Sequence, residues 1–199
     1  MNGDAYLTLA APAEGFYREK GSKFIAKAFP VTNAAEIQAT LVALKKEYAD
    51  ARHHCYAWVL GDVSRVNDAG EPNHSAGTPI LGQIRANNLQ YVLVVVIRYF
   101  GGVKLGVGGL VQAYKTAAAE ALNSATFVEK FLTVSLTVGF PYEAMNAVMR
   151  VVKDRELAVQ AQNFGVACEI TLAVRRSDWQ LVFELFQKAG GQLVAEVQE

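Results

Sequence analysis

One stretch, residues 91–122, limits the folds open to this chain more than any other. It starts with an apolar run at 91–99, passes through a glycine-rich segment and ends in an alanine-rich segment. An unbroken apolar run predicts a strand buried on both faces, in the middle of a sheet. The alanine-rich segment predicts a helix over 110–124 that lies close to that sheet. The chain should therefore contain a central strand joined to a packed helix by a tight glycine turn.

Further elements are predicted on the N-terminal side of this stretch. Apolar and polar patterning predicts strands over 6–10, 22–29 and 52–60. Asn33, followed by Glu36 three residues later, predicts the start of a helix. The sequence predicts a long polar loop over residues 61–75 and a helix over 77–86 that is capped by Ser75. A loop longer than most connections favours a functional role.

Beyond residue 129 the pattern changes character. It predicts strands over 131–138, 157–162, 166–175 and 192–197, and helices over 142–154 and 178–189, the second capped by Ser177. The order βαββαβ is the split, ferredoxin-like pattern. We therefore expect an α+β chain with two domains, residues 1–129 and 130–199.

The composition excludes several classes of protein. The 19 basic and 19 acidic residues balance, so nucleic-acid binding would need a local basic patch and not a basic domain. Two distant cysteines indicate neither a disulfide framework nor a zinc site. The longest apolar run is far shorter than the roughly 20 residues of a membrane helix. We expect a cytoplasmic protein that neither engages a membrane nor carries a cofactor.

The glycine-rich turn is the sharpest functional signal. Glycines let a backbone approach a ligand, and a helix start offers free N–H groups to an anion. The turn is no Walker A motif, because Val107 stands where lysine is required, and no dinucleotide motif, because Val111 replaces the third glycine. Arg98 and Lys104 flank it, which favours a phosphate or carboxylate ligand. The alternative is a tight strand-to-helix connection.

Arg98, Tyr99 and Phe100 stand at the end of the predicted central strand. Alternation places Arg98 and Phe100 on one side and Tyr99 on the other. An exposed arginine beside an aromatic ring would form a platform for a base or a phosphate. An edge salt bridge with two core aromatics is an equally good interpretation.

A second group of candidate residues lies around the strand at 52–60. His53 and Cys55 share one face of that strand and His54 the other, while Asp68 and Glu71 follow in the polar loop. The two carboxylates could work as an acid/base pair, or as a turn former and a solvated side chain. Metal binding and a nucleophilic Cys55 are weaker readings, since a mid-strand cysteine is usually a small core residue. We assign no metal ligand and no catalytic residue.

Three segments, ARHHCYAW, NDAGEP with AGTPIL, and VIRYFGGVKLGVGGLVQAY, resemble the IMPACT family in its bacterial YigZ-like branch. The resemblance implies a first domain similar to the second domain of ribosomal protein S5 and a second domain similar to the last domain of elongation factor G. In that branch basic residues are common where this chain has Thr78 and Gln112, and small Gly-Thr is more usual at His74 and Ser75. Phosphate binding should then be weaker here, unless Lys115 compensates.

Together with the resemblance, these patterns lead us to expect a non-enzymatic binding protein or regulator linked to translation. It would engage RNA, the ribosome or a translation factor through the cleft at Arg98 and the glycine loop. An enzyme acting on a phosphorylated small molecule or nucleotide, and a protein-binding adaptor, stay open as alternatives. Whether the three histidines share one site also stays open. The predicted binding residues are Arg98, Tyr99, Gly101, Gly102, Lys104, Gly106, Gly108, Gly109, His53, His54, Asp68, Glu71 and Lys115.

Overall fold

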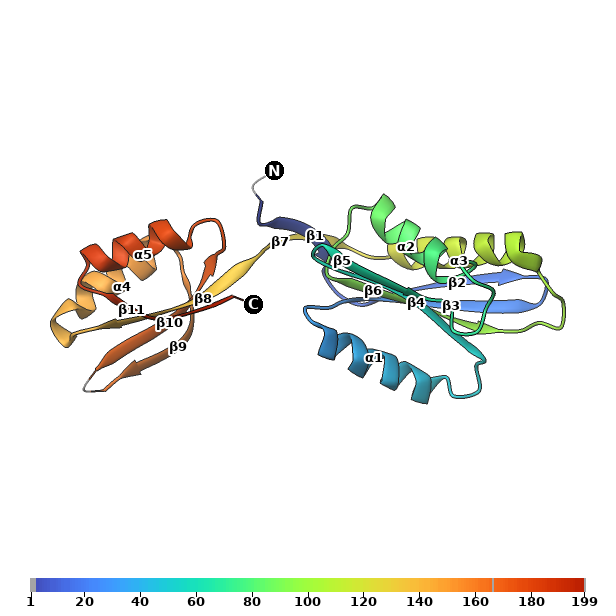
Figure 1. The fold of residues 1–199 in the computed structure, drawn as a ribbon, viewed down its shortest axis with the longest axis horizontal. Helices are drawn as coiled ribbons and strands as arrows, with labels where there is room; N and C mark the ends of the chain where they lie inside the picture. Colours follow the sequence, from blue (N-terminus) through green and yellow to red (C-terminus); the bar gives the residue numbers. More distant parts are fainter. Residues whose placement is uncertain (1–2, 166, 199) are drawn as a thin grey trace. The chain divides into compact units, whose positions relative to one another are not determined.

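A computed structural model describes residues 3–165 and 167–198, so the first residue of the strand predicted over 166–175 lies outside the described part. The chain divides into two compact units. Residues 7–129 form the first unit, and residues from 130 onward form the second together with the residues before Leu7. The α+β class expected from the sequence is confirmed, with strands and helices in both units (Figure 1). Strands β1 (Ala5–Leu9) and β7 (Phe127–Phe131) pair in a small separate sheet.

The first unit is built on a five-stranded sheet in the order β2-β3-β6-β4-β5. Its strands are β2 (Ala13–Glu19), β3 (Ser22–Pro30), β4 (His53–Leu60), β5 (Val63–Asn67) and β6 (Val92–Tyr99). β6 pairs antiparallel with β3 on one side and β4 on the other, and its residues are buried from Val92 to Arg98. The apolar run is therefore the central buried strand that the sequence predicts.

Helices cover both faces of this sheet (Figure 1). α1 (Ala34–Glu47) packs on one face through Ile37, Leu41 and Leu44. α2 (Gly77–Ala86) and α3 (Gly106–Asn123) pack on the other. The predicted cap of α1 is confirmed, because the Asn33 side chain accepts a hydrogen bond from the Glu36 N–H at 2.9 Å. Each face of the sheet thus has its own apolar core.

Four details of the first unit differ from the predictions. The polar loop predicted at 61–75 contains β5, and β2 was not predicted, because edge strands with one exposed face carry mixed patterns. α3 begins at Gly106 and not at Leu110, so its first turn includes part of the glycine segment. Ser75 does not cap α2: its hydroxyl donates to the Pro72 carbonyl at 2.6 Å, and another side chain holds the helix start.

The second unit has the predicted βαββαβ order. Its elements are β8 (Thr133–Phe140), a 3₁₀ turn (Tyr142–Ala144), α4 (Met145–Asp154), β9 (Ala158–Phe164), β10 (Cys168–Arg175), α5 (Trp179–Lys188) and β11 (Gln192–Gln198). The strands lie in the order β11-β8-β10-β9. Asp178, not Ser177, occupies the N-cap position of α5. Within the described residues, no helix of either unit is long and apolar enough to cross a membrane.

Candidate functional site

We call residues 100–109, which follow β6, the glycine segment. Several of its glycines are required by the local backbone or by close packing. Gly102 and Gly106 have positive φ angles of 86° and 71°, which side chains rarely tolerate. Gly101 lies against the turn between β2 and β3, where a Cβ would come within 1.9 Å of the Gly21 carbonyl carbon. Gly108 differs, because its φ is helical and an added Cβ would meet no described atom within 4 Å. At Gly109 an added Cβ would lie 3.1 Å from the Leu105 Cβ, a close contact. A tight connection thus accounts for Gly101, Gly102 and Gly106, and close packing bears on Gly109, but Gly108 is left unexplained.

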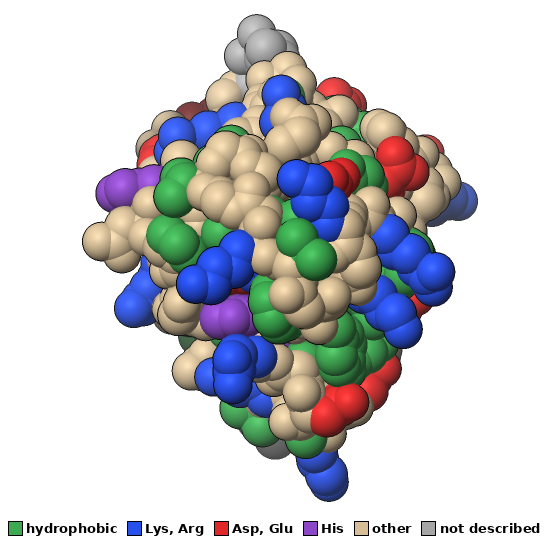
Figure 2. Space-filling model, turned by 90° about the vertical axis from the view of Figure 1, so that its right-hand side faces the viewer, with side chains coloured by type: hydrophobic (Ala, Val, Ile, Leu, Met, Phe, Trp, Pro, Cys, Tyr) green, Lys and Arg blue, Asp and Glu red, His purple; other side chains and the backbone are tan. Residues whose placement is uncertain are grey.

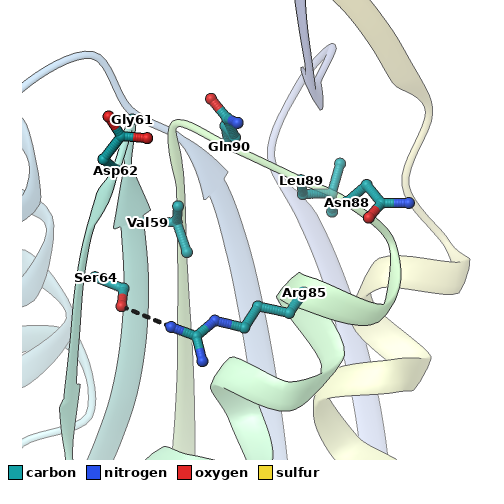
Figure 3. Close-up of a pocket in the computed structure, with 8 residues that line it drawn as sticks. All are labelled: Val59, Gly61, Asp62, Ser64, Arg85, Asn88, Leu89 and Gln90. Atoms are coloured by element: carbon teal, nitrogen blue, oxygen red, sulfur yellow. Dashed lines mark hydrogen bonds between the residues drawn. The ribbon is translucent and has the colours of Figure 1, made fainter.

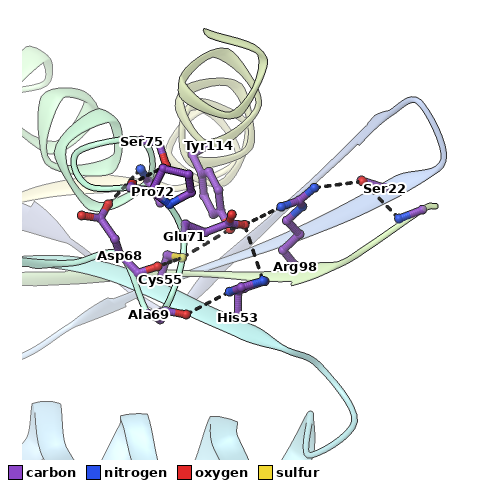
Figure 4. A network of polar contacts seen from close by, with 12 residues as sticks. Ser22, His53, Cys55, Asp68, Ala69, Glu71, Pro72, Ser75, Arg98 and Tyr114 are labelled. Carbon is purple, nitrogen blue, oxygen red and sulfur yellow. Dashed lines mark hydrogen bonds and ion pairs between the residues drawn. The ribbon is translucent and has the colours of Figure 1, made fainter. Parts of the chain in front are cut away.

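Of the two interpretations given for Arg98, the exposed cation is wrong, because the side chain does not stand free on the surface. Its side chain is buried, and its Nη1 donates to Glu71 Oε1 at 2.6 Å (Figure 4). Its Nη2 is 3.4 Å from Ser22 Oγ, and its Cζ lies 5.5 Å from the centre of the Phe24 ring. The strand alternation turns Arg98 toward α3, so the guanidinium enters the apolar core between sheet and helix. A salt bridge within the fold is the interpretation that the geometry supports.

The Glu71 carboxylate lies at the centre of a buried polar network (Figure 4). Besides Arg98, its Oε1 accepts a hydrogen bond from the Tyr114 hydroxyl at 2.8 Å. The Cys55 thiol is 3.3 Å from that hydroxyl and donates to the Asp68 carbonyl at 3.0 Å. Burial raises the pKa of Cys55 to about 12, and burial, with Cys55 and Glu71 nearby, also raises the pKa of Tyr114. Cys55 is therefore a protonated core thiol at neutral pH, not an activated nucleophile.

The histidines do not form one cluster. His53 Nδ1 lies 2.9 Å from the Ala69 carbonyl, which can only accept, so this nitrogen carries a proton and Nε2 faces Glu71 at 4.0 Å. His54 belongs to the opposite face of β4, toward α1, where burial and the charge of Lys45 lower its pKa. His74 precedes α2, with its Nδ1 3.3 Å from Thr78 Oγ1. Among the described residues, no three metal-ligating side chains are placed to hold an ion.

Asp68 holds the start of α2. Its carboxylate accepts hydrogen bonds from the backbone N–H groups of His74, Ala76 and Gly77 at 2.9, 3.0 and 2.8 Å. Burial alone would raise the pKa of Asp68, but these three hydrogen bonds outweigh it and keep the pKa below its usual value. Asp68 and Glu71 are thus both engaged within the fold, which argues against their use as an acid/base pair.

A cavity of about 260 Å³ opens between the glycine segment and this network. Buried Glu71 and Arg98 form its inner end, while Phe100, Val107 and Leu110 contribute apolar walls. Lys104 is exposed and also lines the cavity. The structure therefore brings several predicted residues together, but it presents Lys104, and not Arg98, as the accessible cation.

A second hollow of about 390 Å³ shares Phe100 with the first and extends over β2 and β3. We call the combined surface the loop face and define it by the exposed side chains of Phe16, Arg18, Lys23, Phe100, Lys104 and Val107. Figure 2 looks onto this end and shows Lys and Arg side chains set among hydrophobic ones. Phe16 and Arg18 were not among the predicted binding residues, although their alternation with inward residues along AEGFYRE indicates a half-exposed strand.

Among the remaining predicted residues, Tyr99 lines the second hollow. The hydroxyl of Tyr99 donates to Asp50 at 2.8 Å on the α1 side, while its ring contributes to the second hollow. Gln112 donates to Thr116 at 3.1 Å on the exposed side of α3, and Lys115 is exposed on the same helix. Neither Gln112 nor Lys115 is among the described residues that line the two hollows.

A further cavity, of about 360 Å³, lies toward the other end of β4 (Figure 3). It is lined by Val59, Asp62 and Arg85, and the Arg85 guanidinium donates to Ser64 at 3.1 Å. None of the predicted binding residues is part of its described lining. The glycine segment and the loop face therefore remain the candidate site.

Comparison with known proteins places the glycine segment in a family. Residues 20–122 match the Impact N-terminal domain. An IMPACT family member from Thermus thermophilus is 40% identical over 70% of this chain and 76% of its own, and the Escherichia coli IMPACT family member YigZ is 34% identical over 73% and 74%. A crystal structure of a hypothetical protein covers 96% of this chain and 97% of its own, with a TM-score of 0.74 and 27% identity.

Proposed function

The chain belongs to the IMPACT family, and on this premise we propose that it is a non-enzymatic protein that binds single-stranded RNA through its loop face, in a role linked to translation. The observation that carries the proposal is the mixture of exposed cations and exposed aromatic rings on one surface. Phe16 and Phe100 are 48% and 50% exposed, and Arg18, Lys23 and Lys104 are exposed beside them.

Single strands are the nucleic acids that such a surface fits. Bases of a single strand are free to stack on aromatic rings, at about 1–3 kcal/mol per base, while cations follow the phosphates. In a duplex the base faces are already stacked on each other, so Phe16 and Phe100 would gain little. Because the net charge of the chain is zero, attraction to phosphate depends on this local cluster of cations.

The link to translation rests on the two folds expected from the family motifs. Likeness of the first unit to the second domain of ribosomal protein S5, and of the second unit to the last domain of elongation factor G, forms part of the proposal. Under it, the RNA strand belongs to a ribosomal particle or its messenger in the cytoplasm. Fold likeness alone assigns no site, so the test is made on the loop face.

Fluorescence anisotropy with a labelled single-stranded RNA, measured over a range of salt concentrations, tests the proposal. Three phosphate contacts, from Arg18, Lys23 and Lys104, should give a slope of log K against log salt of roughly −2. Lys104→Ala should weaken binding and reduce the slope by about 0.7. Arg65→Ala is the matched control, because Arg65 is an exposed cation on β5. It lies opposite Trp58 in the pairing of β4 with β5, toward the end of β4 that is distant from the loop face.

Two results would overturn the proposal. One is RNA affinity that does not change with salt, and the other is equal weakening by Lys104→Ala and Arg65→Ala. Preference for duplex over single-stranded RNA would remove the role given to the aromatic rings. If a protein partner is captured in high salt after nuclease treatment, the result favours a protein-binding adaptor over an RNA-binding protein.

A further inference from the structure

We propose that the 260 Å³ cavity between the glycine segment and Glu71 is a pocket for a single unstacked nucleobase. This inference rests on the proposed function, because an RNA strand on the loop face would supply the base. A free nucleotide is a second source of the same chemistry, and the experiment below separates the two.

The walls favour a flat apolar ring. Phe100 is 50% exposed and Val107 57% exposed, and both line the cavity together with buried Leu110. Pockets for drug-sized ligands usually measure about 300–1,000 Å³, so a cavity of this volume suits one ring system and not a dinucleotide. An aromatic base between Phe100 and Val107 would cover apolar surface that is open to water in the free protein.

The inner end favours a ligand with polar edges. Arg98 lines the cavity, and its Nε–H has no hydrogen-bond partner among the described residues. A buried donor without a partner is costly, and a carbonyl group on a base edge offers the missing acceptor. Glu71 beside it accepts N–H groups. An aliphatic side chain from a protein partner would fill the same walls but would leave this polar pair without new contacts.

The entrance favours a phosphate beside the base. Lys104 is exposed at the cavity, and no side chain among the described residues caps the start of α3. The first turn of that helix contains no acidic residue, so its partial positive charge is not offset. Gly108, which packing does not require, leaves the N–H groups of this turn open to a bulky anion. A nucleotide is the ligand that combines a flat ring, polar edges and a phosphate.

The experiment fills the cavity in the full-length chain. Val107→Trp places a large ring at the wall, and Val63→Trp is the control, because Val63 is 61% exposed on β5 and lines neither hollow of the loop face. Each variant is titrated with a labelled uridine octamer and with an octamer of the same backbone that has no bases. Thermal melting confirms that both variants are folded.

We expect Val107→Trp to weaken binding of the uridine octamer about tenfold, the effect of one lost base contact, and to leave the baseless strand unaffected. Val63→Trp should bind both strands as the wild type does. If the wild type binds RNA with the expected salt dependence and Val107→Trp binds equally well, the base pocket is refuted and the proposed function stands. If the wild type binds neither strand, the proposed function itself fails.

Uridine monophosphate, titrated in the same assay as a competitor, separates the two sources of the base. If the wild type binds the octamer, and uridine monophosphate competes with it in the wild type but not in Val107→Trp, the base in the pocket is supplied by the strand. Binding of the mononucleotide without binding of the octamer would keep the base pocket and overturn the RNA assignment. Equal weakening of both octamers by Val107→Trp would show a loss of backbone contacts and contradict base recognition.

Discussion

The Arg98 guanidinium donates a hydrogen bond to the Glu71 carboxylate over 2.6 Å, and both side chains are buried in the first unit. The pair joins the end of the central strand to the loop before α2. An arginine that family motifs and spacing offer as an exposed ligand-binding cation therefore has its charge paired within the fold. The accessible positive charge comes from residues around it, and several measurements follow from this division of roles.

Glu71→Ala should destabilise the protein by about 3–5 kcal/mol, because it leaves the buried Arg98 charge without a partner. Urea denaturation followed by circular dichroism measures the change. Glu14→Ala is the control, since Glu14 is 66% exposed in its ion pair with Lys27 and its removal should cost at most about 1 kcal/mol. Similar losses for the two variants would contradict the assignment of Arg98 as a buried, paired charge.

Asp68→Ala should cost about 1 kcal/mol, and up to about 2, through the loss of the hydrogen bonds at the start of α2. The pKa of Asp68 in the folded state lies below the usual value of 3.8, so its stabilising effect is complete above that value and is lost as the pH falls through the folded pKa. The difference in unfolding free energy between wild type and Asp68→Asn should therefore shrink below about pH 4. A difference that is constant from pH 7 to pH 3 would rule out this role.

His54 should make the stability of the protein depend on pH near and below pH 6.5, a higher range than that of Asp68. Burial lowers its pKa from 6.5, so the folded state binds its proton less readily than the unfolded chain does. Stability should then decrease as the pH falls below about 6.5 and level off below the folded pKa. His54→Gln should reduce this slope, measured by denaturation between pH 5 and pH 8. His74→Gln, at an exposed position outside the strand, serves as the comparison.

Cys55 should resist thiol reagents in the folded protein. Its pKa is raised to about 12 and both cysteines are buried, so little thiolate is exposed at pH 8. Ellman's reagent should titrate neither cysteine in native buffer and both in guanidinium chloride. Rapid reaction of one thiol in the native state, lost in Cys55→Ser, would revive the reading of Cys55 as a nucleophile.

Two glycines in the same segment should respond in opposite directions to alanine. Gly101→Ala should destabilise by several kcal/mol, because the new Cβ would overlap the Gly21 backbone at 1.9 Å. Gly108→Ala should stabilise by about 0.5–1 kcal/mol, since its position is helical and open. Thermal and urea unfolding measure both. If Gly108→Ala weakens RNA binding while it raises stability, the glycine is retained for the ligand and not for the fold.

Local patterns were sufficient for the parts of the fold that depend on neighbouring residues. The apolar run of β6, the Asn33 cap and the alternation in the second unit each reflect short-range physical preferences. The edge strands β2 and β5 were missed because each presents polar side chains to water on one face. The start of α3 was placed late, because glycines have a low helix propensity even where the backbone is helical.

The candidate site was harder to predict because its partners are distant in the chain. Glu71 and Arg98 are 27 residues apart, and nothing in either segment indicates that the loop folds back over the strand end. Phe16 and Arg18 reach the site only through β2, which was not predicted. His54 was included among the predicted binding residues, although alternation along β4 places it on the opposite face from His53.

The contact between Gly21 and Gly101 also has a consequence for the evolution of this surface. The two turns approach each other backbone to backbone, and the Gly101 N–H also donates to Ser22 Oγ at 3.2 Å. A residue inserted in the β2–β3 turn would displace the segment after β6, and with it Phe100 relative to Phe16. The lengths of these two turns are therefore mechanically coupled. Chains that alter one length without the other would lose the alignment of the two hollows before they lose the fold.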